Sequence, residues 1–239
     1  MFEYIRSFGN ARDMFLSAVA VISAIMFAII IHECAHGYVA KLNGDPTAEL
    51  SGRLTFNPAK HFDIIGILMF LVAGFGWAKP VPVDYRNFRK LKQGIFTVAI
   101  AGVVANFIAV IAFGGIFALL ALITKNVDFS EGNLAYMLMF LISQFLVVGI
   151  FINIALIAFN ILPIFPLDGF RIVEAFTKPN NAYVMTMRRY GIFFLIGFIF
   201  LSQLLGNISP YLDLFGLYLS FMRNSLYNLL HLIFPTIVF

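Results

Sequence analysis

The sequence contains little charge. Only 12% of its 239 residues are Asp, Glu, Lys or Arg, and 61% are hydrophobic, whereas soluble proteins carry roughly 25% charged residues. Long polar stretches are also scarce, because the longest one, residues 41–92, is interrupted by the apolar residues 64–78. These features exclude a separate soluble domain. They predict a polytopic membrane protein whose single domain occupies residues 1–239.

Cysteine is almost absent as well. Cys34 is the single cysteine, which excludes an intramolecular disulfide. The N-terminal segment has no charged stretch followed by a short apolar stretch and a cleavage site, so we expect the first helix to be retained. The formal net charge of +4 does not indicate binding to nucleic acid, because the basic residues cluster in segments between the apolar runs.

The apolar runs predict an all-α fold with about five transmembrane helices, since a span needs about 20 apolar residues. The expected helices cover residues 13–42, 94–124, 134–161, 183–205 and 212–234. Between the first two lies a short region with re-entrant or β character. Within it, residues 47–58 alternate and indicate one or two strands, and residues 64–76 are too few to span. Residues 77–83 are interrupted by proline, which favours an edge strand or a loop.

Lysine and arginine counts in the connecting segments predict the orientation. Residues 41–92 contain eight such residues and residues 160–190 contain four, whereas the opposing segments contain only Lys125. Both rich segments therefore belong on the cytoplasmic side. With five spans, this arrangement places the N-terminus outside and the C-terminus in the cytoplasm, although Arg6 and Arg12 argue weakly against it.

The end of the first apolar run carries the pattern H-E-x-x-H, from His32 to His36. Two histidines four residues apart lie on one helix face and can bind a single Zn²⁺, with Glu33 beside them as general base. A carboxylate within a transmembrane helix costs about 2.5–3.5 kcal/mol on insertion scales. The alternative is that these residues mark only the interfacial end of the helix, where such groups cost less.

Asp168 is the predicted third metal ligand. It follows the third long apolar run, just after Pro163 and Pro166 interrupt the chain. Two histidines and one carboxylate leave a fourth zinc position open for water, as catalytic sites require. The bound water would have a pKa near 7 and act as a nucleophile at neutral pH. By itself, however, Asp168-Gly169 is also typical of a simple turn.

Five segments together resemble the site-2 protease family of intramembrane zinc metalloproteases: HECAH at 32–36, NPAKHFD at 57–63, GWAKPVPV at 76–83, AGVVAN at 101–106 and NILPIFPLDG at 160–169. The resemblance is closest to the compact branch without PDZ or CBS domains. It implies zinc on His32, His36 and Asp168, with Glu33 as base. The chain departs from the family at Val103, where proline is frequent, and at Phe170, where glycine or serine is frequent.

Two asparagines in the apolar runs are further candidates for the catalytic site. Asn106 and Asn160 could donate hydrogen bonds to the substrate backbone or to a developing oxyanion, and the resemblance supports this role. Alternatively, they could bond neighbouring helices. His61 could support the metal site, but a loop histidine is more often structural or solvated. The segment Lys79–Val83 could accept an unwound substrate strand or serve as a scaffold.

The sequence thus predicts a zinc-dependent endopeptidase that cuts peptide bonds in or near transmembrane segments of membrane protein substrates. Its catalytic core would cover residues 14–172, with C-terminal helices at 183–234, and its partners would be those substrates and the lipid bilayer. The alternative is a divalent-metal or proton transporter that uses the same histidine, glutamate and aspartate cluster. Transporters often carry internal repeats with paired broken helices, and the sequence contains no such repeat.

Overall fold

The computed structural model describes residues 10–63, 66, 79–127, 133–178 and 180–235. These residues form helices joined by loops, with no β-strand among them. Four helices are long and apolar enough to cross a membrane: α2 (Ala11–Leu42), α6 (Leu91–Thr124), α7 (Leu134–Asn160) and α9 (Ala182–Gly206). The prediction of an all-α polytopic membrane protein is therefore confirmed, and each of these helices begins and ends within a few residues of its predicted limits.

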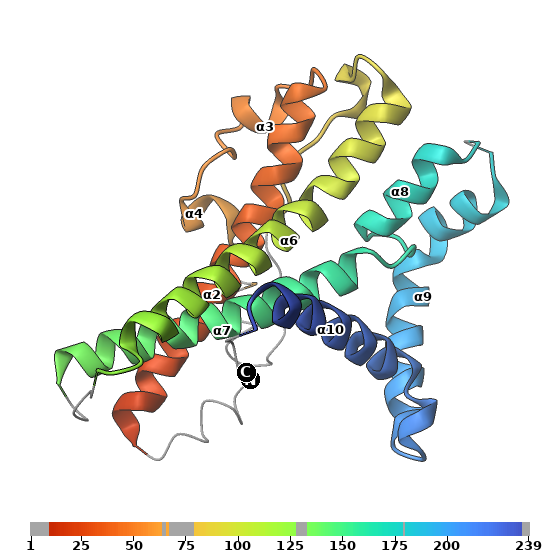
Figure 1. Cartoon of the computed structure of the whole chain (residues 1–239). Helices are drawn as coiled ribbons and strands as arrows, with labels where there is room; N and C mark the ends of the chain where they lie inside the picture. The colour runs from red at the N-terminus through yellow and green to blue at the C-terminus, as the bar shows by residue number, and fades with distance from the viewer. Residues whose placement is uncertain (1–9, 64–65, 67–78, 128–132, 179, 236–239) are drawn as a thin grey trace.

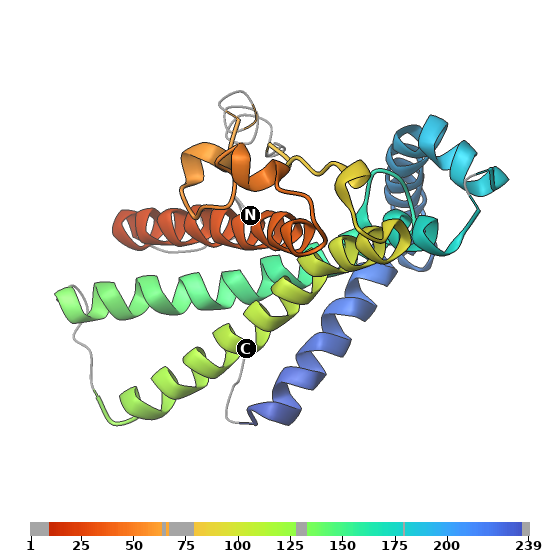
Figure 2. The same cartoon turned by 90° about the horizontal axis from the view of Figure 1, so that it is seen from above.

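Helices α2, α6 and α7 pack against one another, and α9 stands beside them (Figure 1). Seen from above, α7 lies between α2 on one side and α6 and α10 (Leu214–Ile233) on the other (Figure 2). The largest buried cluster joins α6, α7 and α10 through Val110, Phe113, Ile150 and Leu230. Gly149 permits this contact, because a Cβ atom there would lie 2.4 Å from the Phe113 ring.

The predicted fifth span corresponds to α10 (Leu214–Ile233), which is not among the four helices apolar enough to cross a membrane. Its length of 20 residues is sufficient. Its hydropathy is not, because Arg223, Asn224, Asn228 and His231 interrupt the apolar residues. The number of candidate spans among the described residues is therefore four, not five.

The strands predicted at residues 47–58 are wrong. This segment contains the short helices α3 (Thr47–Leu50) and α4 (Pro58–His61) instead. Asn57 caps α4 by accepting a hydrogen bond from the Ala59 N–H, and Pro58 occupies the first helical turn, where its missing N–H costs nothing. The predicted segment 64–76 lies outside the described residues except for residue 66. Residues 79–84 form a loop that leads to the 3₁₀ helix η1 (Tyr85–Asn87).

A buried carboxylate connects the end of α2 to this loop. Helix α2 ends at Asn43 and Gly44, and Gly44 has a φ angle of +108° that favours glycine. The next residue, Asp45, is fully buried and accepts hydrogen bonds from the Asn87 side chain at 2.8 Å and from the Asp84 N–H at 2.7 Å. Burial alone would raise the pKa of Asp45, but hydrogen bonds from Thr47 and these two groups hold it below its ordinary value.

A longer helix was also not predicted from the sequence. Helix α8 (Asp168–Phe176) follows the turn after α7 and packs against α6. Its buried residues Gly169, Phe170 and Ala175 face the bundle. The segment is only nine residues long, so it is too short to stand out as an apolar run, although it decides where Asp168 lies.

Gly191 in α9 touches the turn that precedes α8. A Cβ atom at this position would lie 2.8 Å from the Phe165 carbonyl oxygen and 2.7 Å from the Phe165 Cβ. We expect Gly191→Ala to lower the free energy of unfolding by about 1–3 kcal/mol, because backbone must move to relieve the overlap. Thermal unfolding of the purified protein in detergent would measure the change.

The matched control is Gly197→Ala, in the same helix, where a Cβ atom would meet nothing within 4 Å. This variant should be neutral or more stable by up to about 1 kcal/mol, since alanine favours helix over glycine. Equal destabilisation by both substitutions would contradict the packing described for Gly191.

Candidate metal centre and active site

Two histidines on α2 form one side of the site. His32 and His36 lie on successive turns of the same helix face, and their rings meet edge to face with centroids 4.6 Å apart. Their Nε2 atoms are 3.1 Å apart. Both residues are buried, with 5% and 9% of their surface exposed. The predicted helical spacing therefore places both imidazoles at one point within the bundle.

Asp168 approaches this point from the first residue of α8. Its Oδ2 atom lies 3.3 Å from His32 Nε2 and 3.2 Å from His36 Nε2. One donor atom from each of the three residues lies within 4.8 Å of the others, an arrangement that could hold a metal ion. Asp168 Oδ2 is buried without a hydrogen-bond partner. Such an orphaned acceptor facing two imidazoles fits a divalent cation.

The surrounding helices fix the orientation of both imidazole rings. His36 Nδ1 donates a hydrogen bond to the Val98 carbonyl oxygen on α6 at 2.7 Å, which leaves Nε2 free to bind a metal. The His32 ring lies against Gly102, also on α6, where a Cβ atom would come within 2.4 Å of His32 Cε1. Helix α6 thus needs a residue without a side chain at position 102 to pass this close to α2.

Glu33 lies beside the histidines and is held by the loop before η1. Its Oε2 atom accepts a hydrogen bond of 2.8 Å from the Val81 N–H. The carboxylate borders a cavity of about 360 Å³ that all three candidate ligands also line. The other lining residues are Pro80, Val81, Val83, Tyr85, Val98, Ala99, Asn160, Pro166 and Arg171. The cavity therefore brings a carboxylate and a potential metal centre together.

The two predicted asparagines differ in position. Asn160, the last residue of α7, lines the cavity, and its Nδ2 atom donates to the Leu156 carbonyl oxygen at 3.1 Å. Asn106 is fully buried on α6 and does not line the cavity, and neither of its side-chain polar atoms has a hydrogen-bond partner among the described residues. The structure thus brings Asn160, but not Asn106, to the same cavity as the histidines.

Arg171 and Tyr85 belong to this cavity but were not predicted from the sequence. The Arg171 guanidinium lies 5.5 Å from the centre of the Tyr85 ring and forms an ion pair of 2.8 Å with Glu174. It therefore connects α8 to η1 across the cavity. Arg171 follows Asp168 by three residues, a spacing that places both side chains on one face only if the segment is a helix. The sequence did not predict that α8 is a helix.

Other residues considered in the sequence lie away from the candidate ligands. Cys34 approaches the Thr55 carbonyl oxygen at 3.4 Å, and the fully buried His61 donates to the same oxygen at 2.7 Å. These contacts make His61 part of the loop packing. Phe170 is fully buried against Phe165, with ring centroids 5.6 Å apart, and does not line the cavity. The departure at Phe170 therefore does not narrow the approach to Asp168.

The comparison with known proteins decides the class of this site. The sequence profile described as Peptidase family M50 matches residues 20–203, which include all three candidate ligands and Glu33. The chain belongs to peptidase family M50. It is also 40% identical over 185 residues to the protein named "Putative zinc metalloprotease YwhC" of Bacillus subtilis (strain 168), covering 75% of this chain and 80% of that protein. No solved structure matches the chain.

Membership of the M50 family confirms the predicted enzyme class and cofactor. The protein is a membrane metalloendopeptidase that uses zinc. The three clustered side chains have the donor types of catalytic zinc sites, with two imidazoles and one carboxylate. The divalent-metal transporter considered as an alternative has no comparable support.

Gly102→Ala should weaken metal binding, because the new methyl group would push the His32 ring away from Asp168. We expect metal affinity to fall roughly tenfold, in line with other changes that disturb ligand orientation. Elemental analysis of the purified M50 protein after dialysis against a chelator would measure zinc per chain. Gly115→Ala on the same helix is the control, since its Cβ would approach only the end of the Phe234 ring, at 3.2 Å. Unchanged zinc in the Gly102 variant would contradict the geometry.

Val81→Pro removes the N–H group that holds Glu33. A hydrogen bond to a charged group contributes about 1.5–3 kcal/mol, so its loss should lower peptidase activity roughly 10- to 100-fold. The zinc content should stay unchanged, because the Val81 N–H donates to Glu33 and to none of the three candidate zinc ligands. Val81→Ala retains the N–H and should keep most of the activity. Parallel measurements of cleavage rate and zinc content separate the two effects.

Proposed function

We propose that this M50 peptidase hydrolyses peptide bonds within or beside transmembrane segments of membrane protein substrates. The observation that carries the proposal is the position of the cavity. Its candidate ligands His32 and His36 lie within α2, a helix apolar enough to span a membrane. The catalytic core would be residues 14–172, within a single domain that spans residues 1–239.

In this proposal, His32, His36 and Asp168 hold the zinc ion. When bound, zinc supplies Lewis-acid activation of a water molecule and of the scissile carbonyl. Glu33 accepts the proton of the attacking water and transfers it to the departing amine. The Val81 N–H donates a hydrogen bond to Glu33 Oε2, and this bond fixes the plane of the carboxylate. The other oxygen, Oε1, is then the site of proton transfer.

The asparagines are proposed to contact the substrate. Asn160 lines the cavity, and its Nδ2 atom donates a hydrogen bond to the Leu156 carbonyl oxygen. Its Oδ1 atom is therefore the group that would accept a hydrogen bond from a substrate N–H. For Asn106 the proposed role is a hydrogen bond to water or substrate that enters the bundle, because both buried polar atoms lack a partner. A substrate helix must unwind before it can make such contacts, since helical backbone groups are already paired.

The cavity is proposed to open towards the cytoplasm, with the N-terminus on the outer side. The basic segments 41–92 and 160–190 support this orientation. In Figure 1, α3 and α8, which belong to these segments, lie at one end of the bundle. Water and substrate would therefore enter from the cytoplasmic end of α2.

Glu33→Gln tests the proposed mechanism. The amide can still accept the Val81 hydrogen bond but cannot take a proton, so cleavage should fall at least about 100-fold while zinc is retained. The assay uses purified protein in liposomes with a panel of single-span membrane proteins tagged at both ends. Wild-type rates in the zinc-loaded variant would show that Glu33 is not the base.

Cys34→Ala is the matched control, because Cys34 is the next residue of α2 and its thiol approaches loop carbonyl oxygens and the His61 ring, not the three candidate ligands. It should keep both zinc and activity. If the wild-type protein cuts unfolded soluble casein in a Glu33-dependent manner but none of the membrane proteins, the peptidase mechanism holds and the intramembrane substrate class is wrong.

A further inference from the structure

One nitrogen of Arg53 bonds the backbone of the two residues that precede Val81. Its Nη2 atom donates to the Lys79 carbonyl oxygen at 2.6 Å and to the Pro80 carbonyl oxygen at 3.1 Å. The next N–H group along the chain, that of Val81, donates to Glu33 Oε2 at 2.8 Å. A half-buried guanidinium from one loop therefore holds the backbone that in turn holds the Glu33 carboxylate.

The loop between α3 and α4 carries Arg53 and is itself attached to α2. The Arg53 N–H donates to the Ala48 carbonyl oxygen of α3 at 2.9 Å, and α3 packs against α2. Two residues further on, the Thr55 carbonyl oxygen accepts a hydrogen bond from the Cys34 thiol at 3.4 Å. Cys34 follows Glu33 directly on α2. The loop and the carboxylate are therefore attached to adjacent residues of one helix.

The side chain of Val81 packs on α2 as well. Val81 is buried, with 8% of its surface exposed. It lies against Gly37, where a Cβ atom would come within 2.9 Å of Val81 Cγ1 and within 2.7 Å of Leu54 Cδ2. Leu54 is the neighbour of Arg53 in the sequence. Glycine at position 37 thus allows both loops to pack on α2 one turn after Glu33.

Packing fixes where Val81 lies, but not the direction of its N–H group. That N–H and the Pro80 carbonyl belong to the same peptide unit, which is planar. In a trans unit the two groups point in opposite directions, so a donor on the carbonyl oxygen also sets the direction of the N–H. Arg53 supplies this donor, and Glu33 accepts the N–H. The amide is therefore held at both ends.

The two hydrogen bonds of this amide also strengthen each other. A cation beside the carbonyl oxygen polarises the amide, which makes the N–H of the same unit a stronger donor. The acceptor of that N–H is a carboxylate, so each bond involves a charged partner. The connection from Arg53 to Glu33 therefore runs through a single amide.

We propose that Arg53 is a positioning residue for the peptidase reaction. It holds the Pro80–Val81 amide in the orientation in which the N–H bonds Glu33 Oε2 and leaves Oε1 for proton transfer. Its role rests on the proposed function of Glu33 as the base. Arg53 is not among the described residues that line the cavity, so it acts on the carboxylate from outside.

Hydrogen exchange measured by mass spectrometry tests this geometry without an activity assay. A peptide covering residues 79–83 reports mainly on Val81 and Val83, because two of its residues are prolines without an N–H. In detergent, Arg53→Gln should raise the exchange rate of this peptide about tenfold, since a hydrogen bond that protects it is weakened. Wild-type exchange in the Arg53 variant would overturn the proposal.

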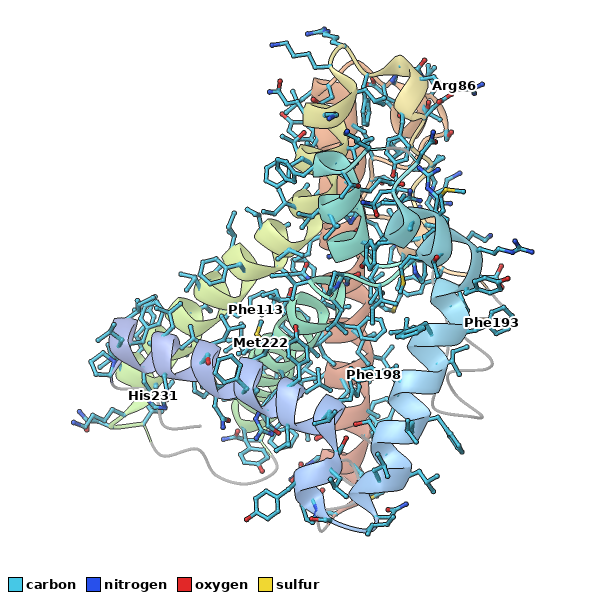
Figure 3. All side chains as sticks on the ribbon, turned by 90° about the vertical axis from the view of Figure 1, so that its right-hand side faces the viewer. Arg86, Phe113, Phe193, Phe198, Met222 and His231 are labelled. Carbon is cyan, nitrogen blue, oxygen red and sulfur yellow. The ribbon has the colours of Figure 1, made fainter. Side chains whose placement is uncertain are left out.

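Arg86→Gln is the matched control for this measurement. Arg86 belongs to η1, five residues after Val81, and lies at one end of the molecule (Figure 3). Its side chain is 89% exposed and pairs with Asp84 at 2.7 Å. The substitution removes a loop arginine without touching the amide that bonds Glu33. It should leave exchange, zinc content and cleavage rate unchanged.

Enzyme kinetics test the consequence for Glu33, with casein and the doubly tagged membrane proteins as substrates. Arg53→Gln should lower kcat about tenfold, with KM and zinc content unchanged. Arg53→Lys should keep most of the rate, because both bonds come from one nitrogen and an ammonium can also donate twice. An equal loss in the glutamine and lysine variants would contradict the proposal.

A double-mutant cycle separates positioning from a general structural effect. In a Val81→Pro background the N–H through which Arg53 acts is gone, so Arg53→Gln should change kcat by less than about twofold. Losses that multiply in the double variant would show that Arg53 acts by another route and would overturn the proposal.

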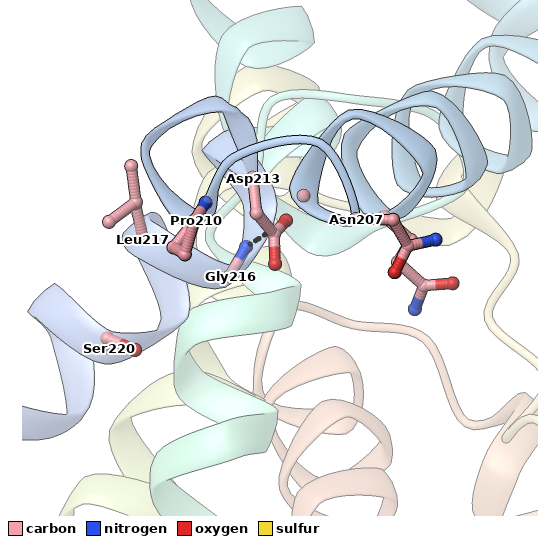
Figure 4. Close-up of a pocket in the computed structure, with 8 residues that line it drawn as sticks. Asn207, Pro210, Asp213, Gly216, Leu217 and Ser220 are labelled. Atoms are coloured by element: carbon pink, nitrogen blue, oxygen red, sulfur yellow. Dashed lines mark hydrogen bonds between the residues drawn. The ribbon is translucent and has the colours of Figure 1, made fainter.

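Loss of stability alone would also lower activity, and Asp213→Ala controls for it. Asp213 caps α10 by accepting the Gly216 N–H at 2.9 Å and accepts the Ser202 hydroxyl at 2.6 Å (Figure 4). It lines a cavity of about 630 Å³ at the α9–α10 turn, which shares no lining residue with the candidate active site. The variant should unfold at a lower temperature but keep kcat. If Arg53→Gln lowers kcat only where it lowers the unfolding temperature, the proposal is wrong.

The inference and the proposed function fail in different ways. If zinc-loaded Glu33→Gln keeps the wild-type rate, Glu33 is not the base and both are wrong. If Glu33→Gln loses activity but Arg53→Gln does not, the base is correctly assigned and only the role of Arg53 is wrong.

Discussion

The architecture depends on bringing one carboxylate to two imidazoles inside an apolar bundle. His32 and His36 are already neighbours on α2, but Asp168 comes from a helix that begins more than a hundred residues later. Three features make the approach possible: Gly102 lets α6 pass against the His32 ring, Val98 orients His36, and the turn after α7 aims Asp168 at both. An ion pair or a metal ion in this setting offsets the free-energy cost of burying these polar groups, which would otherwise have no partners.

The position of Glu33, beside the cluster, depends on a different set of contacts, outside the apolar bundle. Asp45 fastens the end of α2 to residues 84–87, and Arg171 stacks on Tyr85 from α8. Between these two points the loop presents the Val81 N–H to Glu33. Charged and polar groups in these loops thus fix the position of the Glu33 carboxylate. Membership of peptidase family M50 gives this arrangement its chemistry.

The membrane sets the arrangement of the remaining helices. Helices α2, α6, α7 and α9 satisfy the length and hydropathy of a span, and α10 does not. Polar residues along α10, with the exposed Arg223 among them, lower its hydropathy below that of the four candidate spans. The side-chain polar atoms of Asn106 are buried within the bundle and have no hydrogen-bond partner among the described residues.

The sequence by itself determined the four long helices, the shared face of His32 and His36, and the pairing of that face with Asp168. Apolar runs and helical periodicity are local properties of the sequence. The motifs that indicated the family can also be recognised in the sequence without the structure. It did not determine α3 and α4, because the alternation at 47–58 indicated strands; at α4 the Asn57 side chain caps a helix instead. Only the tertiary structure placed Arg171, Tyr85 and Val81 around the cavity and left Asn106 outside it. Those positions depend on how segments distant in sequence pack, which no local pattern encodes.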